Sequence, residues 1–309
     1  MQNRKVAGSA MSQMSASGIM LALAAFAGFP IGDAIIKSMA GEWPAPAVAA
    51  LRYDIGAIGL ALLLFYREGW AGFHVTKPWL HVARGLVLAT GTFCFFSAIY
   101  IMPLADAVAI SFVNPIITAL FSGWFLKEKM RPATWGATII AFGGVLIMLR
   151  PNIGAFGWIA VLPLISAVSM SSMIILNRMV SSQRSVTAAQ FYIAFWAAII
   201  LTIAAFVSHF IIPANKIAAA PSLDVVLRCT VVAITATTCH FLLFRATMKA
   251  SAARIAPIVY IQLLVATAIS VFIFGDPIDP VSLAGGCLIL FSGLLLWRTE
   301  RRAAAGVVA

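Results

Sequence analysis

Long apolar runs make up most of the chain of 309 residues, and each is bounded by proline, glycine or charged residues. Ten runs near the length that crosses a bilayer lie at residues 18–38, 46–66, 79–101, 105–126, 134–149, 156–177, 188–211, 223–244, 253–274 and 281–297. Charged residues make up only 10% of the chain, against roughly 25% in soluble domains. The runs lack the period-two alternation of a membrane barrel. The sequence therefore predicts an all-α integral membrane protein with ten transmembrane helices and no soluble catalytic domain.

The basic residues indicate how these helices cross the membrane. With the N-terminus inside, the inside segments collect sixteen Lys and Arg residues, Arg84 among them, and the other side only Lys37, Arg150 and Lys216. This asymmetry predicts that both termini are cytoplasmic in a multi-pass inner-membrane protein. The net charge of +11 is spread singly or in threes between apolar runs, unlike the clustered basic surface of a nucleic-acid-binding protein.

The chain divides into two halves of five predicted helices. Residues 127–132, Lys-Glu-Lys-Met-Arg-Pro, are matched by residues 275–280, Gly-Asp-Pro-Ile-Asp-Pro, and the helices that follow end at Arg150 and Arg298, the same offset of 148 residues. An odd number of helices per half inserts the second half upside down. We expect cytoplasmic tails at 1–17 and 299–309, and inverted five-helix repeats at 18–150 and 151–298.

Several motifs resemble one known family. The stretch Met-Pro-Leu-Ala-Asp-Ala-Val-Ala-Ile at 102–110, Asn-Pro at 114–115 and Gly-Gly-Val at 143–145 resemble the first repeat of the EamA-type branch of the drug/metabolite transporter superfamily. Residues 256–262, Ala-Pro-Ile-Val-Tyr-Ile-Gln, and the Phe-Gly-Asp-Pro at 274–277 resemble its second repeat. The resemblance covers nearly the whole chain. It implies two inverted five-helix halves around a central cavity. One departure from the family pattern is Asp276, where Glu is commoner.

Four charged residues lie near the outer ends of the first two predicted helices, where burial of a charge costs about 2.5–3.5 kcal/mol without a partner. They are Asp33, Lys37, Arg52 and Asp54. The spacing predicts one outer cluster, whose functional interpretation is a gate or a site that binds a substrate carboxylate through Arg52. The alternative is a structural ion pair between the two helices. The candidate hinges are Gly28, Pro30 and Gly32 in the first helix, with Pro115 and Pro257 later in the chain.

Neutral polar and aromatic residues are the candidate lining of a substrate cavity. They are Tyr100, Ser111, Asn114, Thr118, Ser166, Met170, Thr238, His240, Tyr260 and Gln262. Ser111, Asn114 and Thr118 share a helix face, which favours a cavity over hydrogen bonds between helices, and Asn-Pro at 114–115 permits a local helix break. His240 has two interpretations, a proton-coupling group and a neutral packing residue. For Ser166 and Met170 the alternative is ordinary packing.

These features together predict a secondary transporter and not an enzyme. The neutral lining suits small amphipathic metabolites, and the chosen activity is export of amino acids, including aromatic ones, across the cytoplasmic membrane. Alternatives are an uptake carrier for riboflavin, S-adenosylmethionine or an organic anion, and, of another class, an intramembrane lipid-modifying enzyme. The sequence has no P-loop and no metal-ligand spacing among its four cysteines. We expect no cofactor, no metal, no nucleic acid and no obligate protein partner, only the small-molecule substrate and membrane lipid.

Overall fold

The computed structural model describes most of the chain, and all structural statements below concern that part. The described residues are 2–75, 77–125, 157–180, 185–213, 217, 219–249, 256–276 and 280–306, with isolated residues between 132 and 147. The predicted helix at 134–149 and the repeat junction at 127–132 lie largely outside them.

Every regular element of the described residues is helical, and they contain no strand. The long helices are α1 (Gln2–Lys37), α2 (Ala45–Glu68), α3 (Pro78–Ile99), α7 (Val161–Val180), α8 (Val186–Ile211), α9 (Leu223–Lys249) and α12 (Pro280–Gly306). The shorter ones are α4 (Leu104–Ser111), α5 (Asn114–Phe125) and α11 (Tyr260–Phe272), with 3₁₀ turns η1 (Gly69–Phe73), η2 (Gly157–Ala160) and η4 (Ala256–Val259). The predicted all-α class is confirmed for the described residues.

Local sequence explains where several helices begin and end. Pro44 precedes α2 and Pro78 opens α3, in the positions where a missing backbone N–H costs nothing. Gly69 ends α2 with a φ of 58°, a conformation that glycine adopts without strain. Ser185 caps α8, and its hydroxyl accepts a hydrogen bond from the backbone N–H of Ala188 at 3.1 Å.

The predicted helix at 105–126 is broken in the structure. Its first part, α4, ends at Ser111, and α5 begins at Asn114, directly before Pro115. The break falls where proline removes a backbone donor, as the sequence indicated. The predicted helix at 253–274 begins with an irregular turn as well, because η4 contains Pro257 and precedes α11. The two corresponding segments thus both combine a short helix with a non-α turn.

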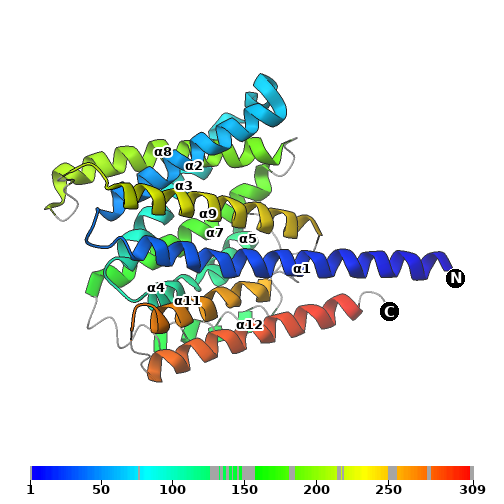
Figure 1. Ribbon diagram of the computed structural model, residues 1–309. Helices are drawn as coiled ribbons and strands as arrows, with labels where there is room; N and C mark the ends of the chain where they lie inside the picture. Colours follow the sequence, from blue (N-terminus) through cyan, green and yellow to red (C-terminus); the bar gives the residue numbers. More distant parts are fainter. Residues whose placement is uncertain are drawn as a thin grey trace.

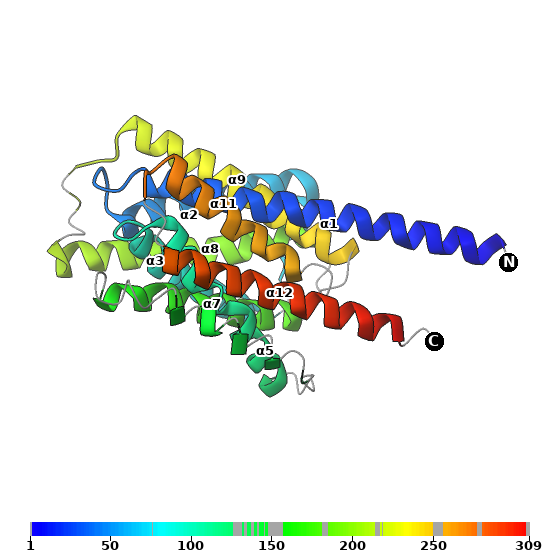
Figure 2. The ribbon, with the colours of Figure 1, turned by 90° about the horizontal axis from the view of Figure 1, so that it is seen from below.

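The helices run roughly along one direction and form a bundle (Figure 1). Helix α1 packs against α9 and α11, α2 against α8 and α9, and α3 against α7 and α8. The turned view shows the start of α1 and the end of α12 on the same side, so that both chain termini lie at one end of the bundle (Figure 2). We call this the terminal end, and the opposite end, where α1 and α11 finish, the far end.

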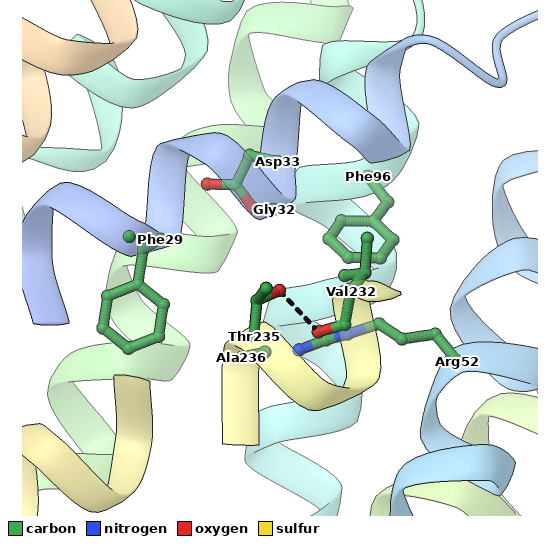
Figure 3. A pocket seen from close by; sticks show the side chains of 9 residues that line it. Phe29, Gly32, Asp33, Arg52, Phe96, Val232, Thr235 and Ala236 are labelled. Carbon is green, nitrogen blue, oxygen red and sulfur yellow. Dashed lines mark hydrogen bonds between the residues drawn. The ribbon is translucent and has the colours of Figure 1, made fainter. Parts of the chain in front are cut away.

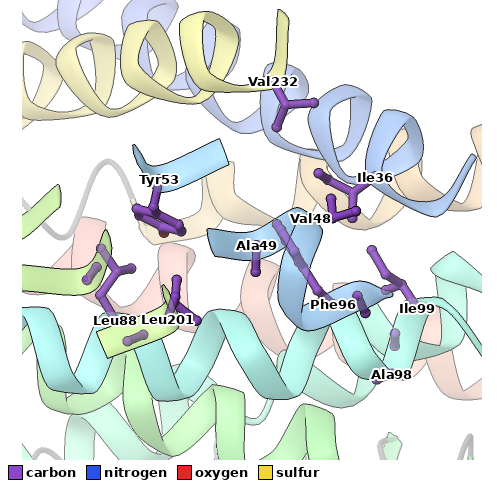
Figure 4. Close-up of a cluster of buried hydrophobic side chains, with 14 of the residues drawn as sticks. Ile36, Val48, Ala49, Tyr53, Leu88, Phe96, Ala98, Ile99, Leu201 and Val232 are labelled. Atoms are coloured by element: carbon purple, nitrogen blue, oxygen red, sulfur yellow. The ribbon is translucent and has the colours of Figure 1, made fainter. Parts of the chain in front are cut away.

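Small residues dominate the contacts between helices. Ala49 and Ala98 are fully buried in the core, which also contains Ile36, Val48 and Phe96 (Figure 4). Many of the large side chains instead face outward, among them Leu62, Tyr66, Phe206, Phe210 and Phe272, each of which is more than half exposed. Close packing of small residues inside and large apolar residues outside is the arrangement that lipid surroundings require.

Length and composition support membrane insertion. Within the described residues, six apolar segments are long enough to cross a bilayer, namely Ser17–Lys37, Ala45–Phe73, Pro78–Ile99, Gly157–Asn177, Val186–Ile211 and Leu223–Leu243. Two shorter apolar helices are Ile261–Phe272 and Leu283–Ser292. The protein is therefore a multi-pass membrane protein.

Arg84 lies in a different place from the one assumed in the charge count. It is 4% exposed within α3 and donates a 2.8 Å hydrogen bond from Nε to Oδ1 of Asn177 on α7. Its Nη1 lies 3.3 Å from His81 Nδ1 and 3.5 Å from the carbonyl oxygen of Ala189 on α8. Arg84 therefore joins three helices inside the bundle and is not a loop residue.

The contact between α3 and α8 provides a test of this packing. A Cβ added at Gly85 would overlap the Cβ of Trp196 and lie 3.1 Å from the backbone nitrogen of Ala197. We expect Gly85→Ala to destabilise the purified protein by about 1–3 kcal/mol, measured as a lower Tm in detergent. Gly59→Ala on α2, where a Cβ would have no neighbour within 4 Å, is the control and should leave the Tm unchanged or raise it. Equal Tm values for both variants would contradict the tight contact.

Candidate functional site

A pocket lies between four helices of the bundle. It is lined by Gly28, Phe29, Gly32 and Asp33 of α1, Arg52 of α2, Phe96 of α3, and Val232, Thr235 and Ala236 of α9 (Figure 3). The free cavity volume inside it is about 30 Å³. Sites for small ligands have roughly 300–1,000 Å³ and a single water needs about 10–15 Å³, so this conformation accommodates water but no metabolite. The lining combines two opposite charges, one hydroxyl and two aromatic rings.

Aromatic rings hold the Arg52 guanidinium. Its Cζ lies 4.4 Å from the centre of the Tyr53 ring and 5.6 Å from that of Phe96, distances at which a ring face stabilises a cation. The Tyr53 hydroxyl lies 3.0 Å from Thr92 Oγ1 on α3, which fixes the ring. Arg52 extends from α2 toward Thr235 and Ala236 (Figure 3), so the positive charge points at α9.

Asp33 provides the negative charge of the pocket. It is half-buried on α1, and no hydrogen bond or ion pair links its carboxylate to another described residue. Asp33 and Arg52 thus border the same space without forming an ion pair of 4.0 Å or less within the described part of the chain. Because both charges lie inside a membrane-spanning bundle, each favours a polar partner or water in the pocket.

The close approach of α1 and α9 shapes one wall. A Cβ at Gly28 would lie 2.5 Å from Cys239 Sγ, and one at Gly32 would lie 3.8 Å from Thr235 Oγ1. Thr235 Oγ1 donates to the backbone carbonyls of its own helix, 2.9 Å from that of Val231 and 3.1 Å from that of Val232. The glycines of α1 therefore let α9 bring the Thr235 side chain to the pocket.

Phe29 and His240 meet beside the pocket. Their rings pack edge-to-face with centres 5.0 Å apart, and Phe29 also lines the pocket. His240 itself is not among the lining residues. This contact agrees with the packing interpretation of His240; the alternative role in proton coupling stays a prediction.

The structure divides the four charged residues that the sequence grouped together. Asp33 and Arg52 border the pocket, whereas Lys37 forms a 2.9 Å ion pair with Asp276, beyond the end of α11. Asp54 accepts hydrogen bonds from Thr202 Oγ1 of α8 at 3.2 and 3.3 Å. The charges therefore form three separate groups. Lys37 lies about one helical turn further along α1 than Asp33, and Asp54, two positions after Arg52, lies on a different side of α2.

Polar residues predicted on α4 and α5 form hydrogen bonds away from the pocket. Asn114 Oδ1 lies 2.9 Å from both Thr118 Oγ1 and Ser171 Oγ of α7. Ser111 Oγ donates to the carbonyl oxygen of Ala107 at 2.9 Å. Asn114 thus joins α5 to α7 in this conformation, and its role in a substrate cavity stays a prediction.

The other predicted lining residues are dispersed. Ser166 is buried on α7, Met170 packs against the core, and Thr238 donates to Ile234 O at 2.8 Å. The buried hydroxyl of Tyr100 makes no hydrogen bond within the described part of the protein. Gln262 is half-buried on α11, and the side chain of Tyr260 lies outside the described residues. Their participation in transport stays a prediction.

Sequence reasoning missed four apolar lining residues, Phe29, Phe96, Val232 and Ala236. Each is an apolar residue in an apolar helix, so composition and spacing carry no signal that distinguishes it from a core or lipid-facing residue. Only the way α1, α3 and α9 are arranged around the pocket identifies them.

Comparison with known proteins places this architecture in a family. The EamA-like transporter family matches the chain twice, over residues 16–150 and again over residues 157–298. The chain belongs to the EamA-like transporter family. The first match runs from within α1 to beyond α5, and the second runs from η2 to within α12. This EamA transporter therefore builds its pocket from three helices of one copy and α9 of the other.

Curated relatives of this EamA transporter are named for different substrates. The pseudopaline exporter CntI of Pseudomonas aeruginosa is 28% identical over 286 residues, 92% of this chain and 97% of its own. The S-adenosylmethionine uptake transporter of Rickettsia bellii is 26% identical over 256 residues, 83% and 84% of the two chains. The aromatic amino acid exporter YddG of Ancylobacter novellus is 30% identical over 127 residues, 40% and 44% of the two chains.

The contact between Gly28 and Cys239 yields a second prediction. Gly28→Ala should push α9 away from α1 and lower the Tm, because its Cβ would overlap Cys239 Sγ. Adding Cys239→Ala removes that sulfur and should restore at least half of the lost Tm, a coupling that separate sites would not show. The measurement is a thermal melt of the wild type, both single variants and the double variant. Additive shifts would argue against direct contact.

Proposed function

We propose that this EamA transporter moves small zwitterionic metabolites across the cytoplasmic membrane by alternating access, and that it exports amino acids, including aromatic ones. The observation that carries the proposal is the pair of opposite charges, Asp33 and Arg52, that border one pocket without pairing with each other. An α-amino acid presents the complementary pair, an ammonium and a carboxylate joined by one carbon.

The surroundings of the two charges fit the rest of such a substrate. Arginine binds a planar carboxylate through two parallel hydrogen bonds, and the Asp33 carboxylate accepts from an ammonium. Phe29 and Phe96 offer ring surfaces for an apolar or aromatic side chain. The cavity of about 30 Å³ holds only water in this conformation, so binding of an amino acid requires the helices to separate.

The proposed architecture is ten helices in two inverted five-helix repeats, at 18–150 and 151–298, with short tails at 1–17 and 299–309. The two family matches and the paired helix breaks at α4–α5 and η4–α11 support it. Both termini lie at one end of the bundle (Figure 1). The distribution of Lys and Arg supports a cytoplasmic location for that end. Inverted repeats can exchange conformations and so expose one site to either side in turn.

A second candidate is uptake of a larger metabolite that contains an amino-acid head group. The Rickettsia relative is named as an S-adenosylmethionine uptake transporter, and that compound carries the same amino-acid head group. Direction of transport therefore separates the two candidates. The relatives described above are all named as transporters, which supports a carrier over an intramembrane enzyme.

The remaining predicted polar residues belong to the proposed path between the pocket and the terminal end. Ser111, Asn114 and Thr118 lie at the break between α4 and α5 or directly after it, and Gln262 lies at the start of α11. In this proposal the hydrogen bonds of Asn114 to α7 exchange for contacts with the substrate when the terminal end opens.

Efflux measurements test the proposed site. Cells loaded with phenylalanine-containing dipeptides should export phenylalanine at least tenfold more slowly with Arg52→Gln or Asp33→Asn than with the wild type, because either variant leaves one charge of the substrate unpaired. Arg67→Gln and Asp224→Asn remove the same charges from exposed positions and should export normally. Wild-type efflux from both pocket variants would refute the site.

Substrate analogues test the zwitterion requirement independently. In counterflow with purified protein in liposomes, phenylalanine should exchange, whereas its methyl ester and its N-acetyl derivative should each exchange at least tenfold less. Each analogue lacks one of the two charges. Equal exchange of all three compounds would show that the two pocket charges do not select the substrate.

A further inference from the structure

A chain of hydrogen bonds connects three helices at the far end of the bundle. Lys37 Nζ, at the end of α1, lies 2.9 Å from Asp276 Oδ2. Ser270 Oγ of α11 donates to the same Asp276 oxygen at 2.8 Å and accepts from the backbone N–H of Ala105, in the first turn of α4, at 3.4 Å. We call Lys37, Ser270 and Asp276 the far-end latch.

The latch is largely buried, and neighbouring groups hold its side chains in place. The side chains of Lys37 and Asp276 are 14% and 25% exposed, and Ser270 is 1% exposed. The Lys37 ammonium also lies 4.5 Å from the centre of the Phe274 ring. The backbone N–H of Asp276 donates to the carbonyl oxygen of Ser270 at 3.0 Å, which holds the acid over the end of α11. Water competes weakly for an ion pair in such surroundings.

The latch joins the two copies of the family sequence. Lys37 and Ala105 belong to the first matched segment, residues 16–150, whereas Ser270 and Asp276 belong to the second, residues 157–298. Opening the far end requires α1 and α4 to separate from α11, because these elements contact one another there. The latch bonds must then break.

The same segment of α1 carries both the latch and the pocket. Asp33 precedes Lys37 by four residues, about one helical turn or 6 Å along the axis. Pro30, which precedes both, removes one backbone hydrogen bond of α1 and makes the segment 31–37 easier to tilt. A tilt that separates Lys37 from Asp276 therefore moves Asp33 as well.

We propose that the far-end latch is a gate: the protein is closed at the far end while Lys37 pairs with Asp276, and breaking the pair opens the pocket to that side. The gate operates on α1 and α11 whatever the transported molecule is.

Chemical labelling of a pocket residue measures the gate directly. In a variant without its four native cysteines, Thr235→Cys reports access to the pocket by its rate of reaction with a membrane-impermeant maleimide, applied to the far end of protein oriented in liposomes. Lys37→Met and Asp276→Asn should each raise this rate at least threefold. The milder Ser270→Ala, which removes one hydrogen bond to Asp276 and preserves side-chain volume, should raise it by a smaller factor.

An ion pair at the same end provides the matched control. Arg228 Nη1 of α9 lies 2.9 Å from Glu42 Oε1, and both side chains are more exposed than those of the latch, at 31% and 41%. Glu42→Gln removes this pair without touching α11, so the labelling rate should stay at the wild-type value. An equal rise in Glu42→Gln, or wild-type rates in both Lys37→Met and Asp276→Asn, would overturn the gate.

Exchanging the two charges distinguishes loss of the ion pair from misfolding of the variants. The double variant Lys37→Asp with Asp276→Lys preserves an ion pair in reverse orientation and should return labelling to within twofold of the wild type. Failure of the exchange to lower the rate below that of the single variants would count against a pairwise gate. Because labelling requires no substrate, its outcome is independent of the phenylalanine efflux and counterflow results.

Discussion

Lipid offers membrane helices neither hydrogen bonds nor a hydrophobic reason to associate, and this constraint shapes the whole bundle. Helices hold together where small residues let backbones approach, as at Gly85 against Trp196 and at Gly28 against Cys239. Large apolar side chains such as Phe206 and Phe272 are instead directed outward. Once the helices are in close contact, any charge on their inner faces has to meet another protein group or water.

The charged residues satisfy that requirement in different ways. Lys37 and Asp276 pair directly, and Arg84 is bound by the neutral acceptors Asn177 and Ala189. Asp33 and Arg52 differ, because they border one pocket and do not neutralise each other through a direct contact. A pair of charges kept apart in this way favours water or a bound dipole between them, which is why the pocket is the strongest candidate for the substrate site.

Sequence patterns predicted the helices well and their mutual contacts poorly. The long apolar runs located α2, α3, α8 and the start of α9 to within about two residues, and Asn114 with Pro115 located the helix break. The same runs did not indicate which face of each helix points into the bundle. The four-residue spacing of Asp33 and Lys37 suggested one cluster, yet Lys37 contacts Asp276, 239 residues further along the chain. That partner depends on how α1 packs against α11, which no local pattern encodes.

The aromatic surroundings of Arg52 have a consequence for the rate of a transport cycle. Ring faces of Tyr53 and Phe96 stabilise its charge, and they do so without engaging N–H groups in the plane of the guanidinium. If Arg52 binds a substrate carboxylate as proposed, that carboxylate meets donors that are already oriented, and no hydrogen bond of Arg52 within the described part of the chain has to break first. Such an arrangement favours fast binding and release of the substrate over tight binding. Fast release is what a transporter needs in each transport cycle.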